Sequence, residues 1–546
     1  MAKWYRPVER DQLFLLPPDM RAWLAADHAV WLVIRVVEEH LDTSALHARR
    51  RTGGAGAAGY HPDMLLTLLV WAYAHQVTSS RRIEVLCGTD VAFKVICGGG
   101  APDHVTIARF RHDFPAVVED LFTQVLVLCA RLGMGQLGVV ALDGTKITAN
   151  AAKKANRTED SLRKMAAETA ARHAATDAAE DRLFGEGERG DRVPPGAAAG
   201  RGRDRDARIR RALAELEAER AAAAAAQAAR QQQQQAHAEA AAAGAPVRGR
   251  PPAGTEVELA RQRVERAGNA QLAKIADWKR RHAEAAAAGQ LRPPGKAPRP
   301  PHESARVRDA RAALAGAQAR AAAAGRKAAQ KKSPGPVRNI TDPDSRLMPV
   351  RGGTFIQGYN AQNVTSADGL IIATEHTQDT TDTGWFEPML RAAEAAAELI
   401  TTHQPTAPPA SSGGIGLLLA DAGYLSEYNL TIDGPDRLIA TGKHRDLEKA
   451  ARSGKNAGEP APREGPIAAM TARLRTDDGI TAYRMRGHIA ETPHGHIKHN
   501  MGFRQHTMRG KPETAAEWKF ACIVHNLFKA ITSGHTTLAS LTRLPA

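Results

Sequence analysis

Cysteine is scarce in this chain. Four cysteines occur among its 546 residues, namely Cys87, Cys97, Cys129 and Cys522. They form neither a CxxC pair nor a ladder of short spacings, the patterns that zinc-binding and disulfide-rich proteins show. We therefore expect free thiols and a reducing compartment.

Long apolar runs are also missing. The longest, such as residues 64–74, are far shorter than the roughly 20 residues that a membrane-spanning helix needs. Residues 1–10 are polar and basic, which is unlike a signal peptide. These two absences predict a soluble, cytoplasmic protein with no membrane partner.

Acidic residues are outnumbered by basic ones. The chain has 74 Lys and Arg against 59 Asp and Glu, a net charge of +15, which favours a polyanionic partner. Residues 151–340 hold 38 basic and 22 acidic residues, a net +16, and the rest of the chain is near neutral. A GC-rich genome would enrich arginine and alanine without a functional reason, but it would not set this charge balance.

Residues 1–134 are predicted to form a helical N-terminal domain. Apolar residues recur there at three- and four-residue steps, the pattern of amphipathic helices. The predicted helices span residues 31–41, 62–75, 79–87, 105–114 and 117–132. Ser79 and Asp103 stand where helix N-caps are expected. Short helices with interleaved arginines suit DNA binding, although an ordinary helical domain has the same pattern.

Residues 151–338 form a distinct insertion that is rich in alanine, arginine, glutamine and glutamate. Strong helix formers fill it between proline clusters, and its few large apolar residues cannot build a deep core. We predict long helical arms, as a hairpin that projects from the body, with a disordered segment as the alternative. The excess of positive charge suggests a grip on DNA phosphates. A helical spacer or a dimer contact is the competing role.

Residues 135–150 and 339–535 are predicted to form one α/β domain, followed by a tail at 536–546. Strands mixed with helices indicate a layered fold with a mixed sheet flanked by helices. Strands are expected at residues 138–142, 354–364, 369–377, 415–420 and 438–440. Helices are expected at residues 385–400, 493–500 and 515–531, and a loop at 443–478.

Two aspartates stand at matching places in this domain. Asp143 directly follows the apolar strand that ends at Leu142, and Asp421 follows the strand that ends at Ala420. Strand ends face the ligand crevice of an α/β sheet. Carboxylates gathered there would repel one another unless a cation lies between them, and Mg²⁺ prefers such oxygen ligands. A lone aspartate at this place is more often a simple cap, so a third residue is needed.

The third residue is Glu491. Proline is tolerated in the first turn of a helix, so Pro493 predicts that Glu491 lies at a helix start. Lys498 follows seven residues later, two turns along and on nearly the same face. A carboxylate and a cation that point the same way suit a metal ion and a DNA phosphate, respectively.

These motifs resemble the insertion-sequence transposases of the DDE class, which have an RNase H-like catalytic domain. One branch of that class carries the signature Y-x2-R-x3-E-x6-K, matched here by Tyr483, Arg486, Glu491 and Lys498. The spacing from arginine to glutamate is one residue longer in this chain than in the signature. Asp143 resembles the first aspartate of the family, and Asp421 resembles the second.

Further segments resemble the same family in the same order. They are residues 60–62, 79–81, 102–107, 341–346 and 358–362. The resemblance therefore covers roughly residues 1–150 and 339–530, and it leaves the insertion out. It predicts an RNase H-like fold for the α/β domain.

The resemblance also implies a chemistry. The three carboxylates Asp143, Asp421 and Glu491 would be catalytic and would bind two Mg²⁺ ions, for which Mn²⁺ can substitute. The protein would cut double-stranded DNA at the terminal inverted repeats of its element and join the freed 3′-hydroxyl to target DNA, as a homodimer on nucleoid DNA. The DNA-contacting residues would be Tyr483, Arg486, Lys498, Arg504 and Arg509.

Other functions stay open on the sequence alone. A DNA-binding regulator or a decayed transposase would bind element ends without cutting them, and an RNase H-like nuclease would cut without strand transfer. The histidines near Glu491 match no usual zinc-site spacing and have no cysteine nearby, so we expect a DNA-facing helix there rather than a zinc site. They are His488, His494, His496 and His499.

Overall fold

The structure is a computed structural model that describes residues 19–48, 59–184, 199–242, 255–289, 291, 293–330, 336–350, 352–405, 414–442 and 465–542. The predictions for residues 1–10 and for most of the loop 443–478 lie outside these ranges. Two compact units are present. The first comprises Met1–Asn156 and Arg338–Ala546, and the second comprises Arg157–Val337.

The first unit begins with a group of short helices. They are η1 (Met20–Ala22), α1 (Ala29–Glu39), α2 (Ser44–His47), α3 (Pro62–Ala74), α4 (Ser80–Thr89), α5 (Val91–Ile96), α6 (His104–Arg111), η2 (Phe114–Ala116) and α7 (Val118–Arg131). The predicted helices all form; the six-residue helix α5 was not predicted, because it is too short to show a helical period. Asp103 caps α6 by accepting from Val105 and Thr106 N–H, whereas Ser79 is an N-cap without a side-chain bond.

A mixed sheet of six strands forms the centre of the first unit. Its strands are β1 (Val139–Thr148), β4 (Arg346–Pro349), β5 (Phe355–Ser366), β6 (Ile371–Thr377), β7 (Leu417–Ala420) and β8 (Asp436–Ile439). The strand order is β4-β5-β1-β7-β8, and β6 also pairs with β5. Pairing is antiparallel among β4, β5, β6 and β1, and parallel from β1 to β7 and from β7 to β8. The predicted α/β class with a mixed sheet is therefore confirmed.

Strand β1 does not end where the sequence predicted. It continues through Asp143 to Thr148, and Asp143 pairs with Asn363 of β5. The prediction stopped the strand at the end of its apolar run. The polar half of β1 is nevertheless extended, because the long antiparallel partner β5 supplies hydrogen bonds along its whole length.

Helices flank the sheet in the second half of the chain. They are η5 (Thr383–Trp385), α12 (Phe386–His403), η6 (Ala422–Tyr424), α13 (Glu427–Thr431), α15 (Pro466–Arg473), α18 (Lys511–Thr532) and α19 (Leu538–Thr542). Helix α15 contradicts the loop predicted over residues 443–478, a stretch whose many polar and glycine residues hide a short amphipathic segment. The helix predicted at 385–400 is α12, and the one predicted at 515–531 is α18.

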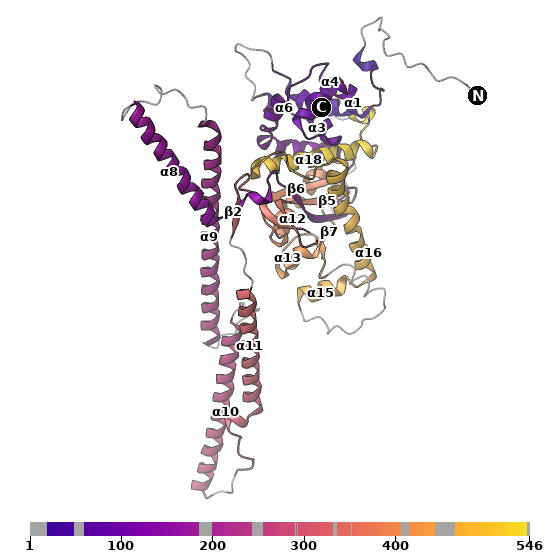
Figure 1. Ribbon diagram of the computed structural model, residues 1–546. Helices are drawn as coiled ribbons and strands as arrows, with labels where there is room; N and C mark the ends of the chain where they lie inside the picture. Colours follow the sequence, from indigo (N-terminus) through magenta and orange to yellow (C-terminus); the bar gives the residue numbers. More distant parts are fainter. Residues whose placement is uncertain are drawn as a thin grey trace, which may run out of the picture. The chain divides into compact units, whose positions relative to one another are not determined.

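Helix α18 is buried between the N-terminal helices and the sheet (Figure 1). It packs on α3 and α7 on one side and on β6 on the other. Trp518 and Phe520 are 1% and 0% exposed. The N-terminal helices and the sheet share one continuous hydrophobic core around this helix. The predicted domain boundaries, including the one at residue 134, stay predictions.

A long irregular helix precedes α18 and carries Glu491. It consists of α16 (Asp477–Arg486), the π-helical turn η7 (Gly487–Glu491), α17 (Thr492–Gly495) and the π-helical turn η8 (His496–Asn500). The residues at each junction keep helical backbone angles. The prediction that Glu491 lies at a helix start is therefore wrong.

Pro493 explains both the error and the π-helical turn. Proline lacks an N–H and its ring crowds the carbonyl four residues earlier, which is that of Ile489. Ile489 lies in η7. A π-helical turn widens the backbone locally, so the helix passes through the proline instead of beginning at it.

Two buried aspartates of the segment 341–346 hold the start of α18. Asp342 accepts from Gly510 N–H at 3.2 Å and from the Tyr359 hydroxyl, and Asp344 accepts from Lys511 N–H at 2.7 Å. Negative charge at a helix N-terminus is favourable because the first N–H groups have no partner within the helix. This segment therefore has a structural role.

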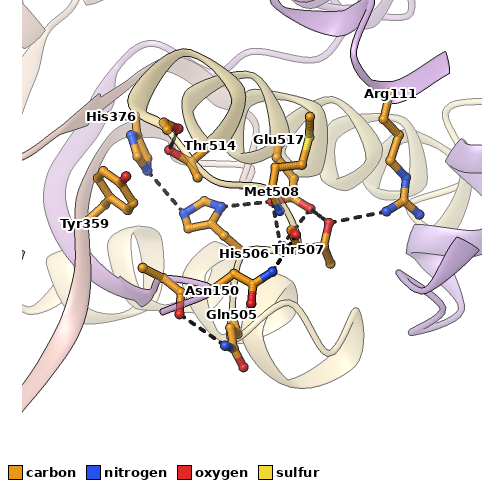
Figure 2. A network of polar contacts seen from close by, with 12 residues as sticks. Arg111, Asn150, Tyr359, His376, Gln505, His506, Thr507, Met508, Thr514 and Glu517 are labelled. Atoms are coloured by element: carbon orange, nitrogen blue, oxygen red, sulfur yellow. Dashed lines mark hydrogen bonds and ion pairs between the residues drawn. The ribbon is translucent and has the colours of Figure 1, made fainter. Parts of the chain in front are cut away.

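Glu517 of α18 is the centre of a buried polar network (Figure 2). Its side chain is 1% exposed. One oxygen accepts from the Tyr73 hydroxyl at 3.1 Å, and the other lies 3.1 Å from His506 Nδ1. Thr507 donates to the same carboxylate through its N–H and its hydroxyl, and Arg111 donates to that hydroxyl. Glu517 thus fixes the segment that follows the long helix.

This segment completes the end of strand β1. Thr148 donates its N–H to the carbonyl of Arg504 and accepts from the N–H of His506. Asn150 donates to the carbonyl of Thr507 at 2.8 Å (Figure 2). The polar network therefore connects α18 with the strand that carries Asp143.

The second unit consists of helices. They are α8 (Glu159–Phe184), α9 (Ala199–Ala242), α10 (Glu256–Ala287), η4 (Pro301–Glu303) and α11 (Ala305–Gln330). Helix α8 packs against α9, and α10 packs against α11 through Ala267, Val307 and Ala310 (Figure 1). Strands β2 (Asn156–Thr158) and β3 (Val337–Asn339) pair at its two ends. The insertion is thus helical in its described part, and the alternative of disorder does not apply to these helices.

Across the described ranges, none of the helices combines the length with the apolar character that crossing a bilayer requires.

Loss of the Glu517 carboxylate should destabilise the first unit. We expect Glu517→Ala to lower the free energy of unfolding by about 3–5 kcal/mol, because buried donors lose their acceptor. Glu517→Gln should cost less, since one acceptor oxygen remains. Glu119→Gln is the control: Glu119 is 75% exposed, and its ion pair with Lys519 is worth at most about 1 kcal/mol. Urea denaturation measures all three, and equal stability of Glu517→Ala and the control would refute this role.

His525 of α18 should make the fold sensitive to mild acid. Its ring lies against the carbonyl of Gly369 and against His496, each at 3.0 Å. Burial lowers the pKa of His525 to about 3, from an ordinary value of 6.5; the hydrogen bond with Gly369 opposes this shift, and His496 and Lys529 add to it. The unfolded ring therefore takes up a proton below pH 6.5 while the folded ring stays neutral.

The contribution of His525 to stability is consequently full above pH 6.5 and should fall by about 1.4 kcal/mol for each pH unit below it. Burial also lowers the pKa of His376, which adds a slope of the same sign. In urea denaturation from pH 7.5 to pH 5, His525→Gln should therefore lose the part of the native slope that His525 contributes and keep the rest. The control His112→Gln changes an exposed histidine and should keep the native slope. An undiminished slope in His525→Gln contradicts the assignment.

Candidate active site

Parallel pairing of β1 and β7 brings Asp143 and Asp421 side by side. Leu142 of β1 is in register with Ala420 of β7, so the next residue on each strand is an aspartate. Neighbouring strands lie about 4.8 Å apart, which places the two carboxylates on adjacent strands at the same height. The sequence predicted this pair; Asp421 directly follows the end of β7 as expected, whereas Asp143 lies within β1.

The two aspartates have opposite pKa shifts. Burial and then the charge of Asp143 raise the pKa of the Asp421 carboxyl. Burial also raises the pKa of Asp143, but His494 and Arg486 outweigh it, so its pKa is lowered on balance. Asp143 therefore keeps its negative charge, and Asp421 bears the repulsion between the two.

Arg486 joins Glu491 to this pair. Its Nη1 lies 3.6 Å from Asp143 Oδ1, and its Nη2 lies 3.7 Å from Glu491 Oε1. Both distances exceed a hydrogen bond, and Nη1 is buried without a hydrogen-bond partner among the described residues. The Arg486 side chain is 14% exposed, whereas that of Glu491 is 59% exposed. The guanidinium thus lies between two of the three predicted carboxylates as a counter-ion, and its predicted contact with DNA stays a prediction.

Lys498 lies on the Asp143 face of β1. Its Nζ donates to the hydroxyl of Thr145 and to the carbonyl of Lys146 at 2.9 Å. Alternation along a strand puts Thr145 on the same face as Asp143. Burial lowers the pKa of Lys498 to about 8, against the opposing charge of Asp143. Lys498 therefore lies near the acidic cluster, and its ammonium group is hydrogen-bonded to strand β1.

Tyr483 is buried beneath the site. Its hydroxyl donates to the carbonyl of Ala420 at 3.2 Å, directly before Asp421, and the side chain is 5% exposed. The sequence predicted a contact with the DNA backbone, but the ring packs in the core with Ala141 and Leu419. The residue supports the strand that carries Asp421.

Asp382 is a fourth carboxylate that the sequence did not predict. Its Oδ1 accepts from Asn360 and from Gln362, each at 2.7 Å, and lies 3.4 Å from Lys146 Nζ. A Cβ on Gly423 would lie 3.0 Å from Asp421 Oδ1 and 3.3 Å from Asp382 Oδ2, so both carboxylates flank that glycine. A signal was present: Asp382 lies in a polar run after a strand, as Asp421 does.

Asp382 explains two features of the sequence. They are the motif at residues 358–362 and the glycine that follows Asp143. Asn360 and Gln362 belong to β5 and hold its carboxylate. A Cβ on Gly144 would lie 2.6 Å from Gln362 Nε2 and 2.7 Å from Asp382 Oδ1. Only glycine leaves room for this close approach between β1 and Asp382.

His494 points into the cluster from the long helix. Its Nδ1 lies 3.8 Å from Asp143 Oδ2, its side chain is 9% exposed, and its Nε2 is buried without a hydrogen-bond partner in the described part of the chain. The sequence identified His494 only as a weak zinc candidate. One helical turn from Glu491, it contributes a second cationic or hydrogen-bonding group next to Asp143.

Arg504 and Arg509 lie on the surface beyond the long helix. Arg504 donates to the carbonyl of Lys498 at 3.0 Å, and Arg509 donates to the carbonyl of Asn150 at 2.9 Å. Both are exposed, and both contact backbone next to the site. Their contact with DNA stays a prediction.

The donor set fits a hard divalent cation. Carboxylate oxygens dominate the cluster, and burial together with repulsion between Asp143 and Asp421 favours a positive ion there. The carboxylates do not converge to within 4.8 Å as a group of three among the described residues, since Arg486 lies between Asp143 and Glu491. The exposed side chain of Glu491 is the one that has room to move.

Two family models match parts of the chain. Residues 18–113 match the model described as "Transposase domain (DUF772)", and residues 454–531 match the model described as "Transposase DDE domain". The first match covers the N-terminal helices, and the second covers the segment with Glu491 and Lys498. The comparisons with curated proteins and with solved structures gave no match. Both matched models describe transposases, and together with the resemblance seen in the motifs they support an insertion-sequence transposase of the DDE class.

Proposed function

We propose that this transposase cuts DNA at the ends of its element and joins the freed ends to target DNA, with two Mg²⁺ ions held by Asp143, Asp421 and Glu491. The observation that carries the proposal is the register of β1 and β7, which gathers two aspartates beside an arginine and a third carboxylate. A mixed sheet flanked by helices supports the RNase H-like assignment. Mn²⁺ is expected to substitute for Mg²⁺.

The protein groups have separable roles in this proposal. Two metal ions supply an activated attacking oxygen and stabilise the leaving oxygen of the phosphodiester. Asp143 and Asp421 hold their positions on rigid strands, and Glu491 turns inward from the helix to complete the ligand set. Tyr483 and Asp382 orient the loop around Asp421. The chemistry needs no covalent protein–DNA intermediate and hence no nucleophilic serine or tyrosine.

Arg486 is proposed to change partners during binding. It neutralises Asp143 and Glu491 from 3.6 and 3.7 Å. If Glu491 held a metal ion, the guanidinium would be free to bind a DNA phosphate with two parallel hydrogen bonds. The role predicted from the Y-R-E-K signature is thereby compatible with the buried position of Arg486.

The DNA partners are the terminal inverted repeats and the target duplex. The exposed Arg504 and Arg509 beside the site are proposed phosphate contacts. Two element ends must be held together, so we propose a homodimer on DNA. The basic insertion is a further candidate for a phosphate grip.

Strand cleavage and strand transfer test the catalytic trio. Purified protein, a terminal-repeat duplex and Mg²⁺ should give nicked and joined products, and Asp143→Asn or Asp421→Asn should reduce both by at least about 10³-fold, since each removes a charged metal ligand. The control Glu398→Gln, an exposed carboxylate on α12, should react like the native protein.

The same assay distinguishes the alternative functions, because each predicts a different set of DNA products. Cutting without joining identifies a nuclease. Binding of the terminal repeat without cutting by any of these proteins identifies a regulator or a decayed enzyme. Asparagine variants that cut at the native rate refute the assignment of the site.

A magnesium titration tests the role of Arg486. Arg486→Ala should need several-fold less Mg²⁺ for half-maximal cleavage, because no guanidinium competes for Asp143 and Glu491. Its maximal rate should fall by about 10²-fold, since a phosphate contact is lost. Arg486→Lys keeps the charge and should retain the native magnesium requirement. If Arg486→Ala needs as much Mg²⁺ as the native protein, the guanidinium does not compete with the metal.

A further inference from the structure

A second cluster of ligand-type side chains lies among the N-terminal helices. His47 is the last residue of α2, and His61 and Asp63 flank Pro62 at the start of α3. One donor atom from each of these three side chains lies within 4.8 Å of the other two. It is the one such group of three His, Cys, Asp or Glu in the described ranges. None of its members takes part in the candidate active site.

The distances within this cluster lie on either side of those expected around a shared metal ion. His47 Nε2 lies 3.0 Å from Asp63 Oδ1, within hydrogen-bond distance, and His61 Nδ1 lies 3.6 Å from the other oxygen, Oδ2. Two donors bound tetrahedrally to one zinc ion, with bonds of roughly 2.0–2.1 Å, are about 3.3–3.4 Å apart. The two imidazole rings meet edge to face with their centroids 4.8 Å apart, and each has one nitrogen near the Asp63 carboxylate.

A comparison with His28 shows that His61 has a different task from an ordinary helix cap. Both histidines are N-caps with nearly identical backbone angles, φ −63° and ψ 132° at His28 and φ −63° and ψ 131° at His61. The ring of His28 caps its helix by accepting from Val30 N–H, whereas the ring of His61 makes no capping bond. Its Nδ1 instead faces Asp63 at a distance too long for a hydrogen bond.

Asp63 has the outer support that ligating carboxylates usually have. The hydroxyl of Thr43 donates to its Oδ1 at 2.5 Å, and Thr43 is 8% exposed. Such bonds to a ligand fix its orientation and raise metal affinity. The carboxylate is itself mostly shielded, with 15% of its side chain exposed, while His47 and His61 are reached from solvent at 40% and 63%.

We propose that His47, His61 and Asp63 bind a zinc ion that clips the end of α2 to the start of α3. Two imidazoles and one carboxylate form a known zinc ligand set, in which water takes the fourth position. The two histidines are separated by 14 positions in the sequence, so the ion closes a loop within the N-terminal helices. The site is independent of the chemistry proposed for the carboxylates on β1 and β7.

Cobalt spectroscopy of the full chain tests this site, because four-coordinate Co²⁺ with nitrogen ligands absorbs strongly in the visible range and six-coordinate Co²⁺ on oxygen ligands does not. Chelator-treated native protein should develop this absorption with one equivalent of Co²⁺ and lose it when Zn²⁺ is added. His61→Ala and His47→Gln should lose the absorption and one equivalent of bound zinc. Thr43→Val should weaken zinc binding by roughly 10–100-fold.

The controls separate this site from the active site and from misfolding. His112→Ala removes an exposed histidine outside the cluster and should bind as the native protein does. Asp143→Asn should keep the absorption, which assigns it away from the catalytic carboxylates. His47→Gln can keep a hydrogen bond to Asp63, and circular dichroism should show a native helix content. A native protein without the absorption, or a folded His47→Gln protein that retains it, overturns the proposal and leaves a hydrogen-bonded His–Asp pair.

Discussion

Like charges held close together are the constraint on which the rest of the first unit depends. The parallel register of β1 and β7 places Asp143 beside Asp421, and the sheet does not allow them to separate. Burial makes the repulsion stronger. Groups on the long helix offset it, since Arg486 lies 3.6 Å and His494 lies 3.8 Å from a carboxylate oxygen of Asp143.

The rigid and the adjustable parts of the site lie on different elements. The aspartates are fixed by strands in the core, and their surroundings are tightly packed, since even a Cβ on Gly144 would collide with Asp382 and Gln362. Glu491 and Arg486 lie on a helix interrupted by two π-helical turns. Such turns are frequent at functional sites, because they change the direction of side chains without breaking the helix.

Buried carboxylates outside the site have a structural purpose. Asp342 and Asp344 hold the start of α18, and Glu517 holds the segment after the long helix against that same α18. Each accepts several hydrogen bonds from groups that would otherwise be buried without a partner. Helix α18, which fills the core, is thus also the element against which the long helix with Glu491 and the end of β1 are aligned.

The sequence by itself determined the α/β class and most helices and strands, because apolar periodicity is a local property. Motif spacing, which is local as well, was enough to propose Asp143, Asp421, Glu491 and Lys498 as site residues. The tertiary structure decided what depends on residues far apart in the chain. The partner strand β5 extends β1 past Asp143, and a π-helical turn carries a helix through Pro493. Asp382 joins the site from a different element, 239 positions after Asp143, which no local pattern connects. Charge pairing and burial arise only when distant segments meet. For this reason only the tertiary structure could show that Arg486 and Tyr483 lie in the interior.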